Sequence, residues 1–600
     1  MRGRSSAAWC TATSTTAWVA GAVVSLLALP QLLGDYWTYQ LSLFFLYAIA
    51  ALGVGLCWGR TGFLPLGQAL FFGLAAYLSG LALIAFEASP WLLLLLPLAA
   101  IAPGLLAFGI GVLVFRRGRE SGPYFSMITL ALSLLGYQLA NSFESVTGGF
   151  NGLKGIPGLP GMDGYVESYY IAGVALIIAV LLLAWLYRAP LGVLWAALSL
   201  NERRVSMFGF DTNRLKAVAF GISGAFAGAA GALYAPQQGL VTPQVVAFIL
   251  SADLVIWTAV RGRSRLLGPA LGAILLSVLT SELRTRFAWW EIVLAVLFIA
   301  VVLLFPDGLA GAVARLLRPF RRAPRASEEI PAPARRDAAW RDPVAGATSH
   351  DDAAQLSVDA VDVQIGEVRI LDKLSLRFDR PAIYCLIGPN GAGKTSTFNM
   401  LTGELSILSG GARFDGKSLI GLPPHRIMRL GIGRKFQIPS VFPELTIADN
   451  LAIAIWSGRT IPLELLRPRL RRWSTPMQKA LCKRYPFLAD AQRTAAELSH
   501  GERQILELAM ALVGEPRLLL LDEPCAGLSP SETSAVVDVI RWAARHTRAM
   551  IIVIEHDMSL VHQLADQVFV LHNGSLLAQG SVAEVQADEA VKAVYVGAEK

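Results

Sequence analysis

The chain has 600 residues, of which 54% are hydrophobic and only 16% are charged, and its formal net charge is +8. This length exceeds what one hydrophobic core holds, so several domains are expected. The five cysteines show no paired spacing, which argues against a disulfide framework or a zinc site.

Apolar runs occupy most of residues 1–306, and the charged residues concentrate after them. Because a helix needs about 20 apolar residues to cross a bilayer, we expect a polytopic α-helical membrane domain with about ten transmembrane helices. The predicted spans lie near residues 17–34, 38–58, 64–86, 91–115, 124–141, 169–187, 217–235, 245–260, 268–283 and 288–305.

The charges in the loops between these runs predict the orientation of the membrane domain. If the amino terminus is cytoplasmic, most loop arginines lie inside, and only Lys154, Arg284 and Arg286 lie outside. This asymmetry follows the positive-inside rule and accounts for the basic charge without a nucleic-acid partner. It also places the second half of the chain in the cytoplasm. The first apolar run lacks a convincing small-residue cleavage site, so no cleavable signal peptide is expected.

Two features inside the predicted spans allow specific expectations. Gly221, Gly224, Gly228 and Gly231 place small residues along one helix and predict close backbone contact with another helix. Asp253 lies inside the 245–260 span. An intramembrane carboxylate either serves function or caps a broken helix, and the sequence leaves both readings open.

The longest predicted cytoplasmic loop runs from residue 188 to 216. Its central part, Asn201 to Phe210, is typical of a short charged helix followed by a glycine stop. A soluble part of the chain can act on a membrane pathway only through such a protruding element. We therefore expect Glu202, Arg203 and Gly209 to belong to a coupling contact, the alternative being a solvated loop.

Residues 307–355 are rich in Ala, Pro and Arg and show little apolar periodicity. This composition predicts a flexible linker whose basic first part lies against anionic membrane lipid. From residue 356 to 600, apolar strand patterns alternate with helical ones, as in a parallel α/β domain. The predicted domains are therefore 1–306, 307–355 and 356–600.

A glycine-rich loop of the form G-x-x-x-x-G-K-[ST] joins an apolar strand at Ile383 to Ile387 to a helix at Thr395 to Leu401. Backbone N–H groups and the helix N-terminus can surround the triphosphate of ATP, Lys394 adds charge at the β- and γ-phosphates, and the Thr395 hydroxyl is placed for Mg²⁺. The alternative is a glycine-rich surface turn. The ATP-binding candidates are Gly388, Pro389, Asn390, Gly391, Ala392, Gly393, Lys394, Thr395 and Ser396.

Further candidates follow other predicted strands. Asp522 and Glu523 end an apolar strand from Arg517 to Leu521, where Asp522 is placed to organise Mg²⁺ and Glu523 to polarise the attacking water. Gln437 is placed to reach metal or water. His556 follows a strand at 550–554 and is placed to contact the γ-phosphate. An exposed glutamine or a strand-end histidine alone has a structural alternative, but their joint order favours ATP hydrolysis.

Ser499 and Gly501 precede a strong helical pattern from Arg503 to Val513. A hydroxyl and amide N–H groups at a helix N-terminus form an anion site, although a capping box alone is common. This motif stands between the phosphate loop and the Asp-Glu strand end.

In that order, the motif set resembles the ATP-binding cassette (ABC) family, over residues 356–600. The resemblance implies that Ser499 and Gly501 close over nucleotide on the phosphate loop of a second ATPase domain. Residues 40–310 resemble permeases of branched-chain amino acid and urea-type ABC importers. The matching stretches are Gly62 to Gly73, Thr147 to Gly152, Ile156-Pro157 and Gly231 to Tyr234. Residues 433–437 and 201–210 look more like the urea and short-amide branch.

Two positions depart from the family pattern. Ile365 stands where cassette ATPases usually carry an aromatic residue against adenine, and Ser529 stands where an aspartate is usual. Phosphate and Mg²⁺ contacts dominate nucleotide affinity. The departures therefore predict weak selectivity for adenine but no loss of hydrolysis.

Together, these observations predict a fused permease and ATPase of an ABC importer in the bacterial inner (plasma) membrane, with a cytoplasmic ATPase domain. The resemblance implies a second permease and a second ATPase, as separate chains or a second copy of this one, and a soluble substrate-binding protein. The solute is urea, a short amide or a branched-chain amino acid. The alternatives are an ABC exporter, disfavoured by ten short-looped spans, and a non-transporting ATP-dependent sensor.

Overall fold

The computed structural model describes residues 6–86, 92–117, 122–159, 164–261, 266–286, 330–331 and 355–597, with the short pieces 289, 292–293, 295–296 and 299–300. The structure divides into two compact units. Unit 1 comprises Met1–Arg188 and Asn213–Arg322, and unit 2 comprises Ala189–Thr212 and Ala323–Lys600. The predicted span 288–305 and the linker 307–355 lie largely outside the described residues, and the predicted domain boundaries stay predictions.

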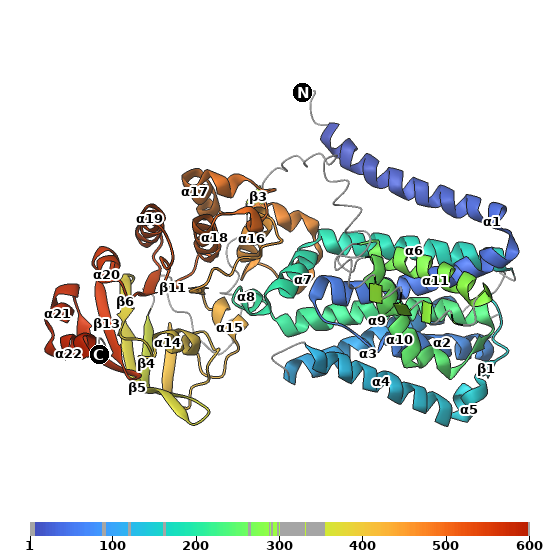
Figure 1. Ribbon diagram of the computed structural model, residues 1–600, viewed down its shortest axis with the longest axis horizontal. Helices are drawn as coiled ribbons and strands as arrows, with labels where there is room; N and C mark the ends of the chain where they lie inside the picture. The colour runs from blue at the N-terminus through green and yellow to red at the C-terminus, as the bar shows by residue number, and fades with distance from the viewer. Residues whose placement is uncertain are drawn as a thin grey trace. The chain divides into compact units, whose positions relative to one another are not determined.

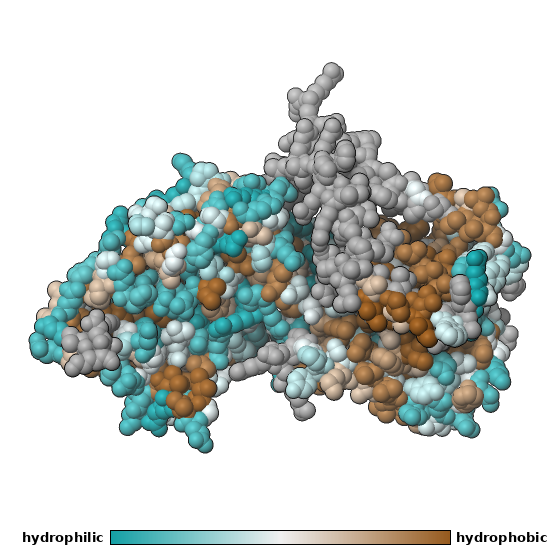
Figure 2. All heavy atoms as spheres, in the orientation of Figure 1, coloured by the Kyte–Doolittle hydropathy of each residue, from teal (hydrophilic) through white to brown (hydrophobic). Residues whose placement is uncertain are grey.

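Unit 1 is built from long apolar helices. The first helix is broken at Gly34, where φ is 72°, and its two halves leave this glycine in different directions (Figure 1). On the face shown in Figure 2, brown hydrophobic residues spread over the unit 1 helices, whereas the surface of unit 2 is mostly teal. The main helices are α1 (Ser6–Gly55), α2 (Gln68–Ala85), α3 (Leu92–Arg117), α4 (Pro123–Ser142), α6 (Tyr165–Arg188), α9 (Thr212–Gln238), α10 (Phe248–Arg261) and α11 (Gly268–Arg286).

Among the described residues, five segments are long and apolar enough to cross a membrane. The predicted spans 17–34 and 38–58 fall on the single broken helix α1. Helices α4, α10 and α11 coincide with three further predicted spans but are not among the five, and α10 is short. The structure therefore supports a multi-pass membrane unit, while the number of ten spans stays a prediction. The five segments are Leu26–Thr61, Gln68–Ala85, Pro97–Arg116, Tyr165–Arg188 and Thr212–Gln238.

The glycines of α9 lie against neighbouring helices, as predicted. A Cβ added at Gly231 would lie 1.9 Å from the carbonyl oxygen of Phe72 in α2, and one at Gly228 would lie 2.4 Å from that of Ala100 in α3. Only glycine permits backbones to approach this closely. Asp253 lies within α10 rather than at its end, so it does not cap a broken helix.

The described part of unit 2 contains two main β-sheets and a short two-stranded one, in which β3 (Ile330–Pro331) pairs in parallel with β10 (Trp473–Ser474). In the six-stranded sheet, the order is β14-β13-β6-β12-β11-β9, and all neighbours are parallel except β13 and β14. The smaller sheet, β5-β4-β7-β8, is antiparallel. The strands are β4 (Leu356–Ile365), β5 (Val368–Phe378), β6 (Ile383–Ile387), β7 (Ser409–Phe414), β8 (Lys417–Ser418), β9 (Ile432–Lys435), β11 (Leu518–Asp522), β12 (Met550–Ile554), β13 (Gln567–His572) and β14 (Ser575–Gly580).

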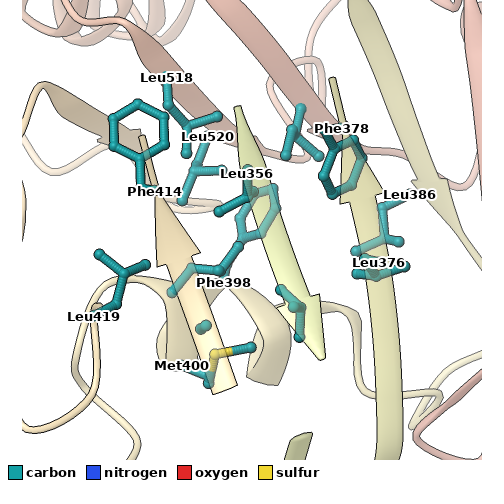
Figure 3. Close-up of a cluster of buried hydrophobic side chains, with 14 of the residues drawn as sticks. Leu356, Leu376, Phe378, Leu386, Phe398, Met400, Phe414, Leu419, Leu518 and Leu520 are labelled. Atoms are coloured by element: carbon teal, nitrogen blue, oxygen red, sulfur yellow. The ribbon is translucent and has the colours of Figure 1, made fainter. Parts of the chain in front are cut away.

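The core of unit 2 lies where the two sheets meet the helix after the phosphate loop. Phe398 of that helix, α14 (Lys394–Leu401), lies beside Leu356 of the small sheet (Figure 3). Met400, Phe414 and Leu518 belong to the same buried cluster. These side chains are at most 2% exposed. Burial at this level fixes α14 and the strand ends rigidly against each other.

Helices cover the sheets, and α16, α17 and α18 gather as one group (Figure 1). The segment Ala189–Thr212, which interrupts the unit 1 sequence, belongs to unit 2 and forms α7 and α8. The unit 2 helices are α7 (Pro190–Leu200), α8 (Glu202–Ser206), α14 (Lys394–Leu401), α15 (Pro424–Arg429), α16 (Ile447–Trp456), α17 (Pro476–Arg484), α18 (His500–Val513), α19 (Pro530–His546), α20 (Met558–Leu564), α21 (Val582–Ala587) and α22 (Glu589–Gly597).

Candidate nucleotide site

Four neighbouring parallel strands bring most of the predicted site residues to one edge of the large sheet. The phosphate loop follows β6, His556 follows β12, Asp522 ends β11 with Glu523 next, and Gln437 follows β9. The carboxyl ends of neighbouring parallel strands meet at the same edge, which is where ligands bind in open α/β sheets. The predicted strands at Ile383–Ile387 and Met550–Ile554 are confirmed.

The phosphate loop is shaped by glycines that no other residue can replace. Gly388 and Gly393 have φ values of 146° and 98°. A Cβ on Gly388 would lie 2.2 Å from the carbonyl oxygen of Leu571. Asn390, Gly391 and Thr395 are exposed, whereas Ala392 is buried and Pro389 and Ser396 are half-buried. The loop therefore presents one open rim in front of α14.

The ammonium group of Lys394 lies inside this loop. It donates hydrogen bonds to the carbonyl oxygens of Gly388, at 2.7 Å, and Pro389, at 3.0 Å. Burial lowers the pKa of Lys394, and the nearby Glu523 and Asp522 partly oppose this effect. Both hydrogen bonds of this cation go to carbonyl oxygens, and the exposed residues Asn390 and Gly391 lie in the same loop, so the loop is suited to bind phosphate oxygens.

Asp522 is 2% exposed, and its Oδ1 atom has no hydrogen-bond partner. Burial raises the pKa of its carboxyl group, while the Arg434 guanidinium, whose Nη2 lies 3.8 Å from Oδ2, opposes the increase. Buried polar atoms are nearly always satisfied in folded proteins. This orphaned oxygen therefore indicates a position for a cation.

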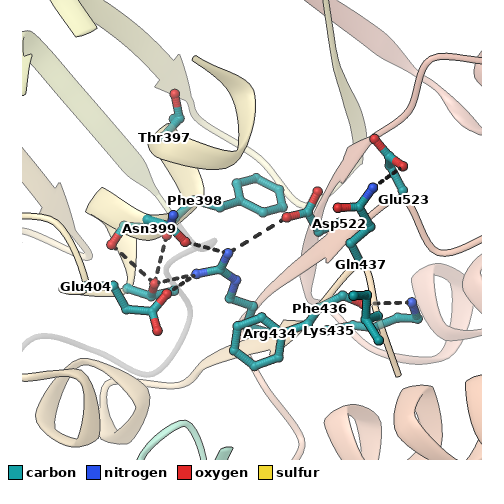
Figure 4. A network of polar contacts seen from close by, with 12 residues as sticks. Thr397, Phe398, Asn399, Glu404, Arg434, Lys435, Phe436, Gln437, Asp522 and Glu523 are labelled. Carbon is teal, nitrogen blue, oxygen red and sulfur yellow. Dashed lines mark hydrogen bonds and ion pairs between the residues drawn. The ribbon is translucent and has the colours of Figure 1, made fainter. Parts of the chain in front are cut away.

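The three predicted catalytic residues meet at the carboxylate of Glu523. Gln437 donates a hydrogen bond from Nε2 to Oε2 at 2.7 Å, as Figure 4 shows, and Nδ1 of His556 lies 3.8 Å from Oε1. Glu523 itself has a φ of 42°, a left-handed conformation that is strained for a side chain of this kind. Such strain concentrates at functional sites, and here it directs the carboxylate outward from the strand end.

Ser499 and Gly501 lie at the N-terminus of α18. The Ser499 hydroxyl accepts a hydrogen bond from the Glu502 N–H, and the Glu502 carboxylate accepts one from the Ser499 N–H. A Cβ on Gly501 would lie 2.1 Å from Oε1 of Glu532. The capping box predicted as the structural alternative is thus present. In the described chain, these contacts are with Glu502 and Glu532 rather than with the phosphate loop.

The predicted coupling residues lie in and just after α8, where Glu202 is the first helical residue. Arg203 forms an ion pair with Glu404, which follows α14. Gly209, with φ of 78°, accepts a hydrogen bond from Nε of Arg429 in α15 at 2.8 Å. The predicted short charged helix with a glycine stop is confirmed, and within unit 2 it contacts α15 and the end of α14.

Sequence reasoning missed the buried charges beside this segment. The side chains of Arg204 and Glu507 are fully buried with Nη2 and Oε1 3.3 Å apart, and Arg204 also donates to the carbonyl oxygen of Arg434 at 2.7 Å. Burial lowers the pKa of Arg204 and lowers that of Arg434 to about 10. Two consecutive cations, Arg434 and Lys435, in an otherwise apolar strand were the available signal, because such residues need buried partners.

The two positions that depart from the family pattern are also located. Ile365 ends β4 and its side chain is 52% exposed. Ser529 is the N-cap of α19, and its hydroxyl donates a hydrogen bond to Glu532 at 2.7 Å. An ionised aspartate has no proton to donate, so the serine makes a contact with Glu532 that the usual residue cannot make.

Comparison with known proteins shows the family of this chain. Residues 371–526 match the family described as ABC transporter, and residues 36–302 match the branched-chain amino acid transport system / permease component. The high-affinity branched-chain amino acid transport ATP-binding protein LivG of Salmonella typhimurium (strain LT2) is 35% identical over 253 residues, which cover 40% of this chain and 97% of LivG. The chain belongs to the ABC transporter family.

Two further similarities cover the same part of this ABC transporter. BraF of Pseudomonas aeruginosa, a high-affinity branched-chain amino acid transport ATP-binding protein, is 32% identical over 40% of this chain and 97% of its own length. A crystal structure of a nucleotide-free ATP-binding cassette from an ABC transporter is 27% identical, with a TM-score of 0.35, over 40% of this chain and 98% of its own. The family assignment depends on the sequence relatives.

The chain is thus a permease fused to an ABC ATPase, and it couples ATP hydrolysis to transport in assembly with other transporter subunits. A membrane unit and an ATPase unit on one chain explain why residues 1–306 are mostly apolar and why the charged residues concentrate after them. The identity of the solute does not follow from these matches.

Proposed function

We propose that this chain imports a small polar solute, urea or a short amide or else a branched-chain amino acid, across the bacterial inner membrane. The observation that carries the proposal is that unit 2 holds both the Glu523 carboxylate with its partners and the segment Ala189–Thr212 from within the permease sequence. The relatives LivG and BraF are named for branched-chain amino acid transport. The motif resemblance favours urea or a short amide, and the scarce charge of the predicted outer loops fits a neutral or zwitterionic solute.

In the proposed mechanism, the phosphate loop binds the ATP phosphates through its backbone N–H groups, and Lys394 exchanges its carbonyl partners for phosphate oxygens. Glu523 accepts a proton from the attacking water, while Gln437 and His556 hold its carboxylate and the water in position. Ser499 and Gly501 act on nucleotide bound to the second ATPase, as the family resemblance implies. Hydrolysis at Glu523 then lets the two ATPases separate.

The residues also fit Mg²⁺. Thr395, Gln437 and Asp522 supply a hydroxyl, an amide oxygen and a carboxylate, the oxygen ligands that this ion prefers, and Oδ1 of Asp522 has no other partner. No group of three His, Cys, Asp or Glu side chains in the described part of the chain can hold a metal, so phosphate oxygens and water must complete the shell. When bound, Mg²⁺ neutralises charge that develops on the phosphates.

One chain supplies one permease and one ATPase, so the proposed assembly needs a second of each, from separate chains or a second copy, and a soluble substrate-binding protein outside. Membrane lipid surrounds about ten spans, and the ATPase is cytoplasmic. Segment 189–212, with Glu202, Arg203 and Gly209, carries motion between ATPase and permease. We propose domain boundaries at 306 and 355, with a linker between them that contacts lipid.

Uptake by right-side-out proteoliposomes tests this function. The assembled transporter, with ATP inside and binding protein outside, should accumulate labelled urea, a short amide or leucine, and Glu523→Gln should abolish the uptake. Accumulation by inverted vesicles with external ATP and no binding protein would instead establish an exporter. Solute movement unchanged in Glu523→Gln would leave only the sensor function.

A further inference from the structure

A chain of alternating charges connects α8 to Asp522. Arg203 donates a hydrogen bond to Oε2 of Glu404. This oxygen also accepts a hydrogen bond from Nη1 of Arg434 at 2.9 Å. Arg434 in turn lies beside Asp522, with Nη2 and Oδ2 3.8 Å apart. Figure 4 shows the guanidinium of Arg434 between the two carboxylates.

The guanidinium is held firmly on one side only. Toward α14 it donates to Asn399 Oδ1 at 2.7 Å and to Thr402 Oγ1 at 2.9 Å, in addition to Glu404. Toward Asp522 there is an ion pair without a hydrogen bond. Nε of Arg434 and Oδ1 of Asp522 are both buried without a partner. The side facing Asp522 therefore has unused hydrogen-bonding capacity.

Each ion in this series competes for the next one. When Arg203 takes more of the Glu404 charge, Glu404 attracts Arg434 less, and Arg434 pairs more fully with Asp522. When Arg203 withdraws, Glu404 pulls Arg434 away and leaves Asp522 with uncompensated charge. The side chain of Arg434 is only 1% exposed and that of Glu404 is 14% exposed, so water screens their mutual attraction weakly. Arg203 is 57% exposed, so water screens its pair with Glu404 more strongly.

We propose that Arg203, Glu404 and Arg434 form a relay that sets the affinity of Asp522 for Mg²⁺ according to how α8 is seated. Arg434 and Glu404 are positioning residues, because they act through Asp522. This inference rests on the proposed function, in which Asp522 organises Mg²⁺ and α8 belongs to the coupling segment. It adds a direction: a seated α8 weakens Mg²⁺ binding, and a displaced α8 strengthens it.

The relay predicts that two substitutions shift the Mg²⁺ dependence of nucleotide binding in opposite directions. Arg203→Gln and Glu404→Gln both remove the same ion pair. If this pair served only to dock α8, both substitutions would shift the Mg²⁺ dependence in the same direction. The relay instead expects Arg203→Gln to lower the Mg²⁺ concentration for half-maximal nucleotide binding, because Glu404 then holds Arg434 away. It expects Glu404→Gln to raise this concentration, because Arg434 turns to Asp522. A shift of about threefold to tenfold is expected for Glu404→Gln, which changes a weakly screened charge contact. A smaller shift of about twofold is expected for Arg203→Gln, because Arg203 is 57% exposed and water screens its pair.

The experiment measures binding of a fluorescent ATP analogue to the full-length chain during Mg²⁺ titration, in a Glu523→Gln background that excludes turnover. Arg471→Gln is the matched control, since Arg471 pairs with Asp449 outside the relay. Arg434→Met should abolish both shifts when combined with either variant, and Arg434→Lys should preserve their signs with smaller size. The lysine variant keeps the charge and guards against a folding defect in the methionine variant.

The outcomes separate the relay from the function on which it rests. If Asp522→Asn leaves Mg²⁺ dependence unchanged, the proposed metal site is wrong, and the relay with it. If Asp522→Asn abolishes Mg²⁺ dependence but Arg203→Gln and Glu404→Gln shift in the same direction, or neither shifts, the relay alone is overturned. Shifts that persist in the Arg434→Met background also overturn it.

Discussion

The two units of this transporter solve the packing of polar groups in different ways. In unit 1, helices meet at glycines such as Gly228 and Gly231, and buried hydroxyl groups bond to backbone carbonyl oxygens, as Ser79 does with Ala232 at 2.8 Å. In unit 2, opposite charges are buried against each other, including Arg204 with Glu507 and Arg434 with Asp522. Close backbone packing tolerates no displacement, whereas a network of competing charges changes its pairing when a charged ligand arrives.

The comparison assigns a physical role to each unit. We expect the helices of unit 1 to move as rigid bodies, because interlocked backbones resist sliding. We expect unit 2 to respond to phosphate and metal, because its buried ions include polar atoms without hydrogen-bond partners. Substitutions that exchange these properties should therefore have distinct effects in the two units.

The largest effect is expected where backbone packing is tightest. Gly231→Leu places a side chain against the carbonyl of Phe72, where even a Cβ lies at 1.9 Å, and should destabilise the protein by more than about 3 kcal/mol. Gly109→Leu is the control, because a Cβ there meets nothing within 4 Å. Yield of monodisperse protein in detergent measures the difference. Equal yields for both variants would show that α9 does not depend on close contact.

In unit 2, Arg204→Met removes one partner of a fully buried ion pair. The expected loss of stability is about 2 kcal/mol, below the usual cost of an orphaned buried charge, because Lys435 remains 4.0 Å from Glu507. Thermal denaturation of the solubilised chain measures it. Adding Glu507→Gln should recover part of the loss, and a double variant less stable than the single one would contradict the pairing.

Glu555 predicts a pH dependence that sharpens the contrast. Burial raises the pKa of its carboxyl group from 4.5 to about 7 in the folded protein. Between these values the folded state binds more protons than the unfolded state, so stability falls as pH rises through this window. At pH 8, Glu555→Gln should increase the free energy of unfolding by about 1–2 kcal/mol and so raise the denaturation temperature. At pH 5 it should have little effect. An equal gain at both pH values would exclude ionisation as the cause.

The smallest effect is expected at the adenine position. Ile365 offers no aromatic face, so the wild-type protein should bind ATP and GTP with similar affinity. Ile365→Tyr should increase the preference for ATP by about 1 kcal/mol through stacking. Competition between the two nucleotides for a fluorescent analogue measures this. Strong ATP preference in the wild type would show that adenine is recognised elsewhere.

The sequence predicted those parts of the site that are local in the chain. A strand, a loop and a helix in succession define the phosphate loop, and strand ends place Asp522, Glu523 and Gln437 at one sheet edge. The pairing of Arg203 with Glu404 joins residues about 200 positions apart, and no periodic pattern encodes such a contact. The sequence placed residues 188–216 in a cytoplasmic loop with a coupling contact, but it did not predict that all of Ala189–Thr212 groups with unit 2, because α7 is as apolar as a membrane helix.

Segment 189–212 is proposed to link ATP hydrolysis to solute movement. Gly209→Leu tests it most directly, because it adds bulk against the Cγ atom of Arg429, 3.1 Å from an added Cβ, at a left-handed glycine. Gly416→Leu imposes the same backbone strain with open space around it. In proteoliposomes, the ATP hydrolysed per solute imported should rise severalfold for Gly209→Leu and stay at the wild-type ratio for Gly416→Leu. A wild-type ratio in both variants would contradict the account.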